Sequence, residues 1–417
     1  MAADWICCQL GAREHYAVPR ALSRAGRLVC LVTEVWVRPG SPWRWLPGRR
    51  ASRWRERFHP ELAQAPVRAF NFPSLVFEPT HCLWPGGTWA RLMARNRWFQ
   101  RKAVDCLQRL DLRLSTPDSR PTLFAYSYAA LGPFRFAQSQ GWRAVLGQID
   151  PGPVEAEIVG AEHDRHPELK TRWQPPPDGY WRAWREECAL ADWIVVNSEW
   201  SREALCREGV PKQKLRVIPL AYEAPLTERR PERQYPARFS PERPLRVLFL
   251  GQIILRKGVA QVLRAAELLQ KAPVEFWMVG PSDVVSLAER TSGGNLRWFG
   301  PVPRGEAGRF YEEADVLLFP TLSDGFGLTQ LEAQAHRLPV IASRHCGAVV
   351  QHGVNGSVLP EVSAAAIVKA LSACLESPAN LREWARASAV AEEFGLGRVG
   401  QRLLSMTGDG RDELPVP

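Results

Sequence analysis

The sequence lacks the long apolar runs and clustered ligands that mark membrane proteins and metalloproteins. No stretch of the 417-residue chain approaches the roughly 18 apolar residues that span a bilayer. The amino terminus has no basic segment followed by an apolar region, so we expect no secretory signal. The nine cysteines include no CxxC pair and no Cys/His cluster at zinc-ligand spacing. We therefore expect a cytoplasmic protein without a metal site, whose cysteines are small apolar residues.

Signatures of several other nucleotide-dependent or nucleic-acid-dependent classes are missing as well. No predicted strand is followed by GxGxxG, which argues against a nicotinamide-dependent oxidoreductase on the same kind of sheet. The chain has no GxxxxGK[ST], which argues against a P-loop ATPase. It also lacks zinc-finger and RNA-recognition signatures, so we expect no specific nucleic-acid partner, although the charge suggests one.

The net charge of +10 is concentrated in two tryptophan-containing stretches of the first half. Trp36–Pro60 holds seven arginines, one carboxylate and four tryptophans, and Arg91–Arg101 holds four arginines beside Trp98 and Phe99. Such stretches can attract the phosphates of nucleic acids, anionic lipids or phosphorylated acceptors. They can equally be solvated basic faces with aromatic side chains packed beneath them. Under the first interpretation, Trp36–Pro60 predicts peripheral contact with the inner face of a membrane.

Short apolar segments alternate with helix-like segments, which is typical of parallel sheets with crossover helices. The segments are continuously apolar, as expected when both faces of a sheet are covered. Those of the first half are Trp5–Gly11, Leu28–Val37, Pro121–Tyr128, Arg143–Asp150, Ala191–Ser198 and Leu215–Ala221. Those of the second half are Leu245–Gly251, Val274–Gly280, Ala314–Pro320 and Leu338–Ser343.

Tyr222–Pro244 separates the two sets and carries five prolines, many charges and no periodicity, which is typical of an interdomain connection. We place the boundary near residue 225. The sequence thus predicts an α/β protein of two doubly wound, Rossmann-like domains, 1–225 and 226–417, facing each other across a cleft. A C-terminal helix from about residue 395 can pack back onto the first domain.

The most specific segment of the second half is Ser323–Ala333, which contains DGFGLTQLE after the strand ending at Pro320. Its two glycines allow close approach of a ligand to the backbone, and the amides of the following helix suit an anion or sugar oxygens. We expect Asp324 in the loop and Glu332 about one and a half turns into the helix. Both carboxylates could then accept hydrogen bonds from ribose or sugar hydroxyls. Alternatively, Asp324 is only a helix cap and Glu332 only a solvated residue.

A second candidate segment is Gly251–Gly258, which directly follows a predicted strand. A strand, a glycine turn and the cations Arg256 and Lys257 at the start of a helix could hold a diphosphate. A surface turn with two solvated cations is the alternative for this segment taken alone.

Together these motifs resemble the retaining glycosyltransferase family 4, whose members have the GT-B fold. The E-x7-E motif of that family corresponds to Asp324-x7-Glu332, and its Lys-Gly pair to Lys257-Gly258. Arg297–Val302 resembles the loop that commonly faces the nucleotide base. The resemblance covers roughly Ala191 to Asn355 and is weak before that.

The resemblance implies a nucleotide-diphosphate sugar as the donor, no cofactor and no metal, because protein cations take the place of a metal ion. It implies that Lys257 and Arg256 hold the diphosphate, Glu332 the ribose and Asp324 the donor sugar. The remaining donor-binding residues it implies are Gly251, Gln252, Gly258, Val302, Gly325, Phe326, Gly327 and Leu328. On the acceptor side it implies Gly11, Arg13, His15, Gln148 and Asp150.

The chain departs from the family pattern at three places. Asp324 stands where the family has a longer glutamate, Gln252 stands where an arginine commonly follows the turn glycine, and the first-domain histidine has no match. These departures favour an alternative, a non-catalytic nucleotide-sugar-binding or regulatory protein on the same scaffold. We expect a glycosyltransferase whose acceptor is a glycan, a lipid-linked molecule or a small molecule.

Overall fold

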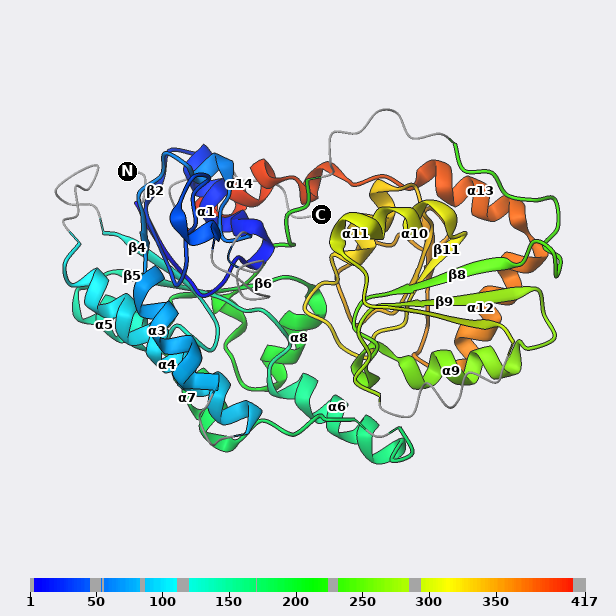
Figure 1. Ribbon diagram of the computed structural model, residues 1–417, viewed down its shortest axis with the longest axis horizontal. Coiled ribbons are helices and arrows are strands. Elements are labelled where there is room, and N and C mark those ends of the chain that lie inside the picture. The colour runs from blue at the N-terminus through cyan, green and yellow to red at the C-terminus, as the bar shows by residue number, and fades with distance from the viewer. Residues whose placement is uncertain are drawn as a thin grey trace.

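A computed structural model describes residues 4–45, 54, 56–82, 87–110, 120–169, 171–223, 232–284 and 294–407. Within these ranges the chain forms two parallel sheets, each covered by helices on both faces, which lie side by side (Figure 1). This confirms the predicted α/β fold of two doubly wound, Rossmann-like halves. No helix among the described residues is long and apolar enough to cross a membrane.

The first sheet has seven parallel strands in the order β3-β2-β1-β4-β5-β6-β7. Its strands are β1 (Trp5–Gln9), β2 (Leu28–Thr33), β3 (Val67–Ala69), β4 (Thr122–Tyr126), β5 (Arg143–Gly147), β6 (Trp193–Val196) and β7 (Leu215–Val217). Its helices are α1 (Ala17–Arg24), α3 (Asn71–Cys82), α4 (Thr88–Leu107), α5 (Leu131–Ser139), α6 (Pro153–Arg165), α7 (Asp178–Leu190) and α8 (Glu199–Arg207).

Alternate side chains of β1 serve the two faces of this sheet, since successive strand residues point in opposite directions. Ile6 and Cys8 pack in one core with side chains of α4, α5 and α7. Trp5 and Cys7 pack in the opposite core with side chains of α1. The continuously apolar strand is therefore explained by two covered faces.

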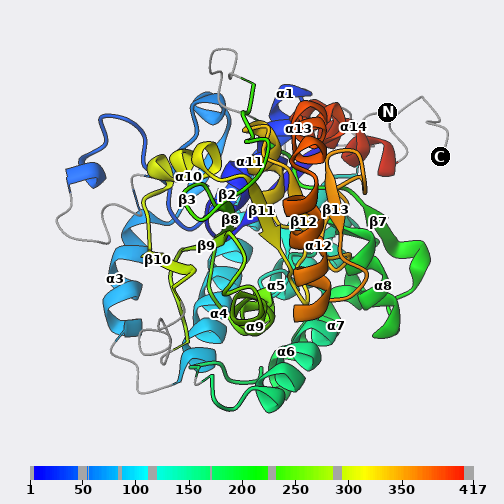
Figure 2. The same cartoon turned by 90° about the vertical axis from the view of Figure 1, so that its right-hand side faces the viewer.

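The second sheet has six parallel strands in the order β10-β9-β8-β11-β12-β13, and Figure 2 shows β10 and β13 at opposite edges. Its strands are β8 (Leu245–Leu250), β9 (Val274–Val279), β10 (Leu296–Gly300), β11 (Val316–Phe319), β12 (Val340–Ala342) and β13 (Gly356–Val358). The helices that follow β8 in the chain are α9 (Val259–Leu268), α10 (Ala307–Glu313), α11 (Thr329–Ala335), α12 (Ala364–Glu376), α13 (Pro378–Ala387) and α14 (Leu396–Met406).

All ten predicted apolar segments contain a strand, but the edge strands β3, β10 and β13 were not predicted. Arg297–Val302, which resembles a base-facing loop, lies mostly in a strand. Leu296–Gly300 pairs with β9 as an edge strand. Its side chains alternate between exposed and half-buried, so it lacks the continuous apolar pattern of the central strands. Only Pro301 and the half-buried Val302 lie beyond the strand, where a loop begins.

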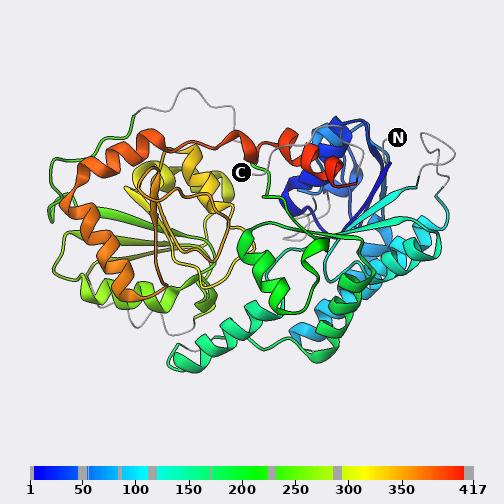
Figure 3. The ribbon, with the colours of Figure 1, turned by 180° about the vertical axis from the view of Figure 1, so that it is seen from behind.

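The chain returns to the first half of the molecule at α14, the last helix of the described residues. The last helix of the second half, α13, lies on that half, whereas α14 lies beside α1 of the first (Figures 1 and 3). Gly400 permits this close approach, since an added Cβ would lie 3.3 Å from the Cβ of Ala21. Gly395–Gly400 matches the GxGxxG pattern, but it begins this helix with no strand before it and therefore is not a dinucleotide fingerprint.

Most of the described aromatic residues of the two basic stretches are packed inside, although Trp43 and Phe58 are half-buried. Trp36, Trp54, Trp98 and Phe99 are all buried. This supports, for these side chains, the interpretation in which aromatics pack beneath a basic face. Arg49, Arg50, Arg53 and Arg55 of the predicted membrane contact lie outside the described residues.

Candidate active site between the two sheets

Two cations and a carboxylate of the second half meet at one point. Lys257 forms an ion pair with Asp324, and the Arg256 guanidinium lies 3.8 Å from the same carboxylate. Arg256 also donates to the backbone oxygen of Ser323 at 2.8 Å. The Lys257 ammonium lies 4.8 Å from the centre of the Phe319 ring, a cation–π contact. The structure thus brings together three of the four residues predicted to act on the donor.

The sheet order explains why these residues meet. The chain winds outward in opposite directions from β8 and β11, so the crevice at their carboxyl ends is a topological switch point, where ligands bind in such sheets. Lys257 follows β8, and Asp324 follows β11. Gly258 lets the two segments touch: its φ is +76°, and an added Cβ would lie 2.1 Å from the Pro320 oxygen.

Two small cavities, of about 220 and 190 Å³, adjoin this cluster, and Arg256 lines both. The first, of about 220 Å³, is bounded by the glycine turn, both cations and the start of α11. Gly251, Gln252, Lys257 and Thr329 are among its lining residues. Gln252 is exposed, and Gly251 has room beside it, since an added Cβ would meet nothing within 4 Å. We call this space the phosphate cavity, because it has the size and the cations that a phosphate group requires.

The loop after Asp324 contacts the first half of the molecule. An added Cβ at Gly325 would lie 2.4 Å from the Ile149 oxygen, so only glycine fits there. Phe326 is buried, and Gly327 has a φ of +86° beside the Phe319 ring. This left-handed residue precedes α11, which begins at Thr329 after the half-buried Leu328. Glycine is therefore required at two positions of this loop for different reasons.

Glu332 does not lie one and a half turns into its helix, as predicted, but in the first turn of α11. The left-handed Gly327 delays the start of the helix by several residues. The Glu332 carboxylate accepts a hydrogen bond from the Tyr311 hydroxyl at 2.6 Å. Tyr311 comes from α10, so this carboxylate is held from a second helix.

Asp150 is the centre of the polar network on the first half of the molecule. One of its carboxylate oxygens accepts from the Tyr128 hydroxyl at 2.5 Å, from the Gln148 amide at 3.2 Å and from the Gly152 backbone at 2.9 Å. Trp184 donates to the other end of the Gln148 amide at 3.0 Å, which fixes its orientation. Burial raises the pKa of the Asp150 carboxyl above its usual value.

The predicted loop after β1 lies on the same side as this network. Gly11 has a φ of +87°, and Arg13 places its guanidinium 5.6 Å from the centre of the Tyr126 ring. His15 is exposed, and it lies between Glu14 and Tyr16 in a run of three non-glycine residues with φ between 49° and 61°. Each such residue carries conformational strain, which concentrates at functional sites.

Glu155, on α6, joins the two halves and was not predicted. Its carboxylate accepts from the Ser323 hydroxyl at 3.0 Å and lies 3.4 Å from the Arg256 guanidinium. Burial raises its pKa to about 7, against the opposing effect of Arg256. Burial also raises the pKa of Asp324, but Lys257 and Arg256 outweigh it, so that pKa lies below its usual value. Asp324 is therefore held ionised, whereas Glu155 titrates near neutral pH.

Sequence reasoning missed Tyr128, Glu155 and Tyr311, all of which hold predicted site residues. For Tyr128 a signal existed: it follows β4, which lies beside β1 at the switch point of the first sheet. For Glu155 and Tyr311 no local pattern existed, because their partners are distant in sequence. Among the described residues, no group of three or more His, Cys, Asp or Glu side chains could hold a metal ion.

A family model and several curated proteins match parts of this chain. Residues 244–377 match the model of the family described as glycosyl transferases group 1. The amylovoran biosynthesis glycosyltransferase AmsK of Erwinia amylovora is 28% identical over 194 residues, which are 43% of this chain and 46% of that protein. The D-inositol 3-phosphate glycosyltransferase of Kineococcus radiotolerans is 30% identical over 271 residues, 56% of this chain and 60% of that one. The chain thus spans about half the length of the curated relatives it matches.

Solved structures match almost the whole chain at low identity. Anabaena Alr3699/HepE, solved in complex with UDP, has a TM-score of 0.60 and 16% identity, covering 97% of this chain and 99% of its own. The sucrose-phosphate synthase of Thermosynechococcus elongatus has a TM-score of 0.64 and 18% identity, covering 97% and 98%. These likenesses confirm the expected GT-B fold, and the family match lies on the half that carries Lys257, Asp324 and Glu332.

Proposed function

We propose that this chain is a retaining glycosyltransferase of the family 4 type, which moves a sugar from a nucleotide-diphosphate sugar to a glycan, lipid-linked or small-molecule acceptor. The observation that carries the proposal is the convergence of Lys257 and Arg256 on Asp324 beside the phosphate cavity. The match of residues 244–377 to glycosyl transferases group 1 supports it.

In this proposal the two cations bind the diphosphate of the donor. When the bond between the anomeric carbon and the phosphate breaks, negative charge builds on the leaving diphosphate while the sugar becomes oxocarbenium-like. Lys257 and Arg256 stabilise that charge without a metal ion, because both are already oriented by Asp324, Ser323 and Glu155. Fixed cations of this kind contribute most where water is largely excluded.

The carboxylates position the donor. Glu332, oriented by Tyr311, binds the ribose hydroxyls, and Asp324 binds the donor sugar. The acceptor hydroxyl attacks the anomeric carbon from the face that the diphosphate leaves. Its proton passes to the departing phosphate oxygen, so configuration is retained and no protein base is required.

A thermal-shift screen against UDP, GDP and ADP and their sugar conjugates tests this proposal. A ligand at 100-fold over its Kd adds about 2.7 kcal/mol, which raises the midpoint by a few degrees. We expect UDP to give the largest shift, since the fold neighbour from Anabaena was solved in complex with it. Glu332→Ala should lose the shift, whereas Glu376→Ala, an exposed change on α12, should keep it. No shift with any nucleotide in the folded protein would refute the donor site.

A non-catalytic nucleotide-sugar-binding protein is the second candidate, and it is favoured by the missing first-domain histidine and by Asp324 and Gln252, where the chain departs from the family pattern. Both candidates predict binding of the nucleotide sugar. Only the enzyme releases the nucleoside diphosphate, so release of UDP from the nucleotide sugar separates them.

A further inference from the structure

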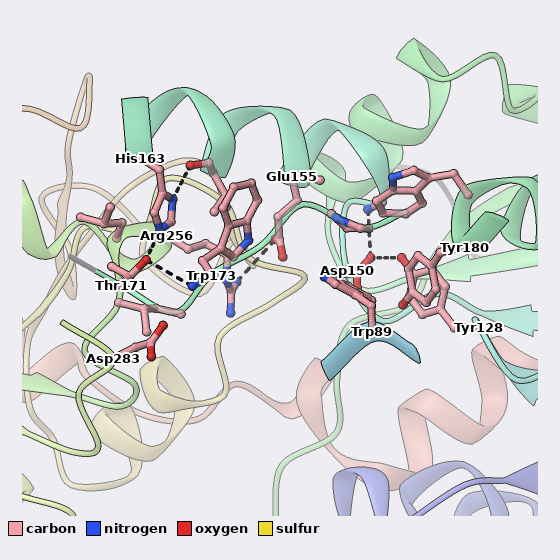
Figure 4. Close-up of a pocket in the computed structure, with 17 residues that line it drawn as sticks. Trp89, Tyr128, Asp150, Glu155, His163, Thr171, Trp173, Tyr180, Arg256 and Asp283 are labelled. Carbon is pink, nitrogen blue, oxygen red and sulfur yellow. Dashed lines mark hydrogen bonds and ion pairs between the residues drawn. The ribbon is translucent and has the colours of Figure 1, made fainter. Parts of the chain in front are cut away.

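A second cavity, of about 190 Å³, lies between α6 and α7 of the first half and the turn after β8. Figure 4 shows its lining side chains, with Trp89, Tyr128 and Tyr180 at one end and Trp173, His163 and Thr171 at the other. None of the aromatic residues here was among the predicted site residues. We call this space the aromatic cavity.

Aromatic rings line both ends of this cavity. Trp89, Trp173 and Trp181 are each half-buried, so their indoles are partly accessible in the ligand-free protein. Tyr128 and Tyr180 stack on each other with their centres 4.5 Å apart, and Trp181 lies edge-on to that pair. Large rigid rings of this kind offer flat apolar faces at low entropic cost.

Carboxylates supply the polar groups of the same cavity. Asp150 and Glu155 both line it, and Asp283 lies at its far end (Figure 4). Carboxylate oxygens accept hydrogen bonds and donate none when ionised, so they suit a ligand that presents hydroxyl groups. Apolar faces together with hydroxyl acceptors are the chemistry that recognises a sugar ring, whose C–H groups and hydroxyls point in different directions.

The aromatic cavity adjoins the phosphate cavity. Arg256 lines both, so it forms part of the wall between them. Asp324, to which we assign the donor sugar, does not line the aromatic cavity, whereas most of its lining comes from the first half. A ligand there therefore lies next to the donor diphosphate without occupying the donor's own position.

We propose that the aromatic cavity binds one neutral pyranose ring of the acceptor, stacked on the indoles and hydrogen-bonded to Asp150 and Glu155. The inference rests on the proposed function for the identity of the acceptor, but binding of the sugar ring does not depend on it. The cavity is smaller than the roughly 300–1,000 Å³ of drug-sized sites, so it holds one ring and the rest of the acceptor extends outside.

The charge of the cavity selects against phosphorylated sugars. Three acidic side chains, Asp150, Glu155 and Asp283, line the cavity with one guanidinium, that of Arg256, and Glu155 is ionised above its pKa of about 7. A phosphate placed there would meet like charges in a partly buried site, which is unfavourable. We therefore expect a neutral hexopyranoside to bind and its 6-phosphate to be excluded.

Saturation-transfer difference NMR on the full chain tests the site directly, with methyl α-D-glucopyranoside, methyl α-D-mannopyranoside and glucose 6-phosphate as probes. We expect transfer to the ring protons of at least one methyl glycoside and none to the sugar phosphate. Equal transfer to glucose 6-phosphate, or no transfer to either glycoside, would overturn the inference.

Trp173→Leu and Trp181→Leu remove one indole each and keep an apolar side chain. Each should weaken glycoside binding about tenfold, as loss of a central aromatic anchor commonly does. Trp384→Leu, on α13 of the second half, removes a half-buried indole away from both cavities and should leave binding unchanged. Unchanged glycoside binding in both folded cavity variants would contradict the site.

UDP binding by the same variants separates failure of this inference from failure of the proposed function. Trp173→Leu should keep the UDP-induced thermal shift, because the phosphate cavity is intact. A protein that binds UDP but no glycoside contradicts the aromatic cavity alone. A protein that binds the glycoside but no nucleotide contradicts the proposed function and leaves the sugar site standing.

Discussion

In the ligand-free site, the side chains that would bind the donor are already in place and are paired with one another. Lys257 and Arg256 are neutralised by Asp324 and Glu155, and a diphosphate would have to replace part of this pairing. The shorter Asp324, which departs from the family pattern, is the direct partner of Lys257. Its loss would leave a partly buried cation without a counter-charge, which is costly.

Glu155 gives the site a pH dependence whose sign follows from its raised pKa. Burial raises this pKa from 4.5 to about 7, so the folded protein binds more protons than the unfolded chain between these values. The free energy of unfolding contributed by this group therefore falls as pH rises from about 4.5 to about 7, and the loss is complete above pH 7. Glutamine at this position cannot ionise and carries no such penalty.

We predict that the free energy of unfolding of Glu155→Gln, relative to that of the natural protein, increases by on the order of 1–3 kcal/mol as pH rises from 4.5 to 8. Urea denaturation of both proteins at several pH values measures the difference. Glu157→Gln, an exposed change on the same helix, controls for the altered net charge. A stability difference that stays constant with pH would show that Glu155 does not titrate in this range.

At the scale of the elements, the loops after β8 and β11 form the site because glycines let them touch. Gly258 and Gly209 both have left-handed φ values, of +76° and +81°. An added Cβ at Gly258 would clash with the Pro320 oxygen, whereas at Gly209 it would meet nothing within 4 Å. The two positions therefore separate the cost of backbone strain from the cost of a steric clash.

Gly209→Ala should cost about 1–2 kcal/mol, the penalty of a left-handed alanine. Gly258→Ala should cost several kcal/mol and should also weaken nucleotide binding, because the two loops must move apart. Chemical denaturation and UDP titration of both variants measure these effects. Equal costs at both positions would contradict the close approach of Gly258 to Pro320.

The central strands were predictable from sequence because burial on both faces leaves a continuous apolar run. The edge strand β10 and the start of α11 were not. Leu296–Gly300 alternates in exposure, and the helix before Glu332 starts late because Gly327 is left-handed. Local pattern predicts what the core requires, whereas a left-handed glycine and an edge strand depend on tertiary neighbours.

At the scale of the whole molecule, α14 ties the end of the chain to the first half. Val399 and Leu403 of α14 pack in the same core as Val18 and Leu22 of α1. The donor half is thus linked to the first half both by the segment after β7 and by this returning helix (Figure 3). Such a return restrains how the two halves move about the site between them.

Leu403→Ala should cost about 2–5 kcal/mol, since the side chain is fully buried and its removal leaves a cavity. Ser405→Ala, on the exposed side of the same helix, should change stability by less than about 0.5 kcal/mol. Differential scanning calorimetry measures both. A Leu403→Ala protein as stable as the Ser405→Ala control would show that α14 is not firmly packed on the first half.

Motifs predicted the donor side of the site better than the acceptor side. Lys257, Arg256 and Asp324 lie within two short segments next to central strands, so their convergence follows from the sheet order. The aromatic cavity is assembled from α4, the ends of β4 and β5, α6, α7 with the segment before it, and the turn after β8. Such a set has no sequence pattern, because its members meet only once both halves are folded.

The rate of UDP release from UDP-glucose or another nucleotide sugar by the natural protein and by Lys257→Ala tests the central claim most directly. Loss of this cation should lower the rate about 10²-fold or more, since a preorganised group at the developing charge is removed. Lys271→Ala, an exposed change after α9, should leave the rate unchanged. Release by the natural protein that is lost only in Lys257→Ala would support the donor site as described. Equal release by a folded Lys257→Ala protein would contradict it.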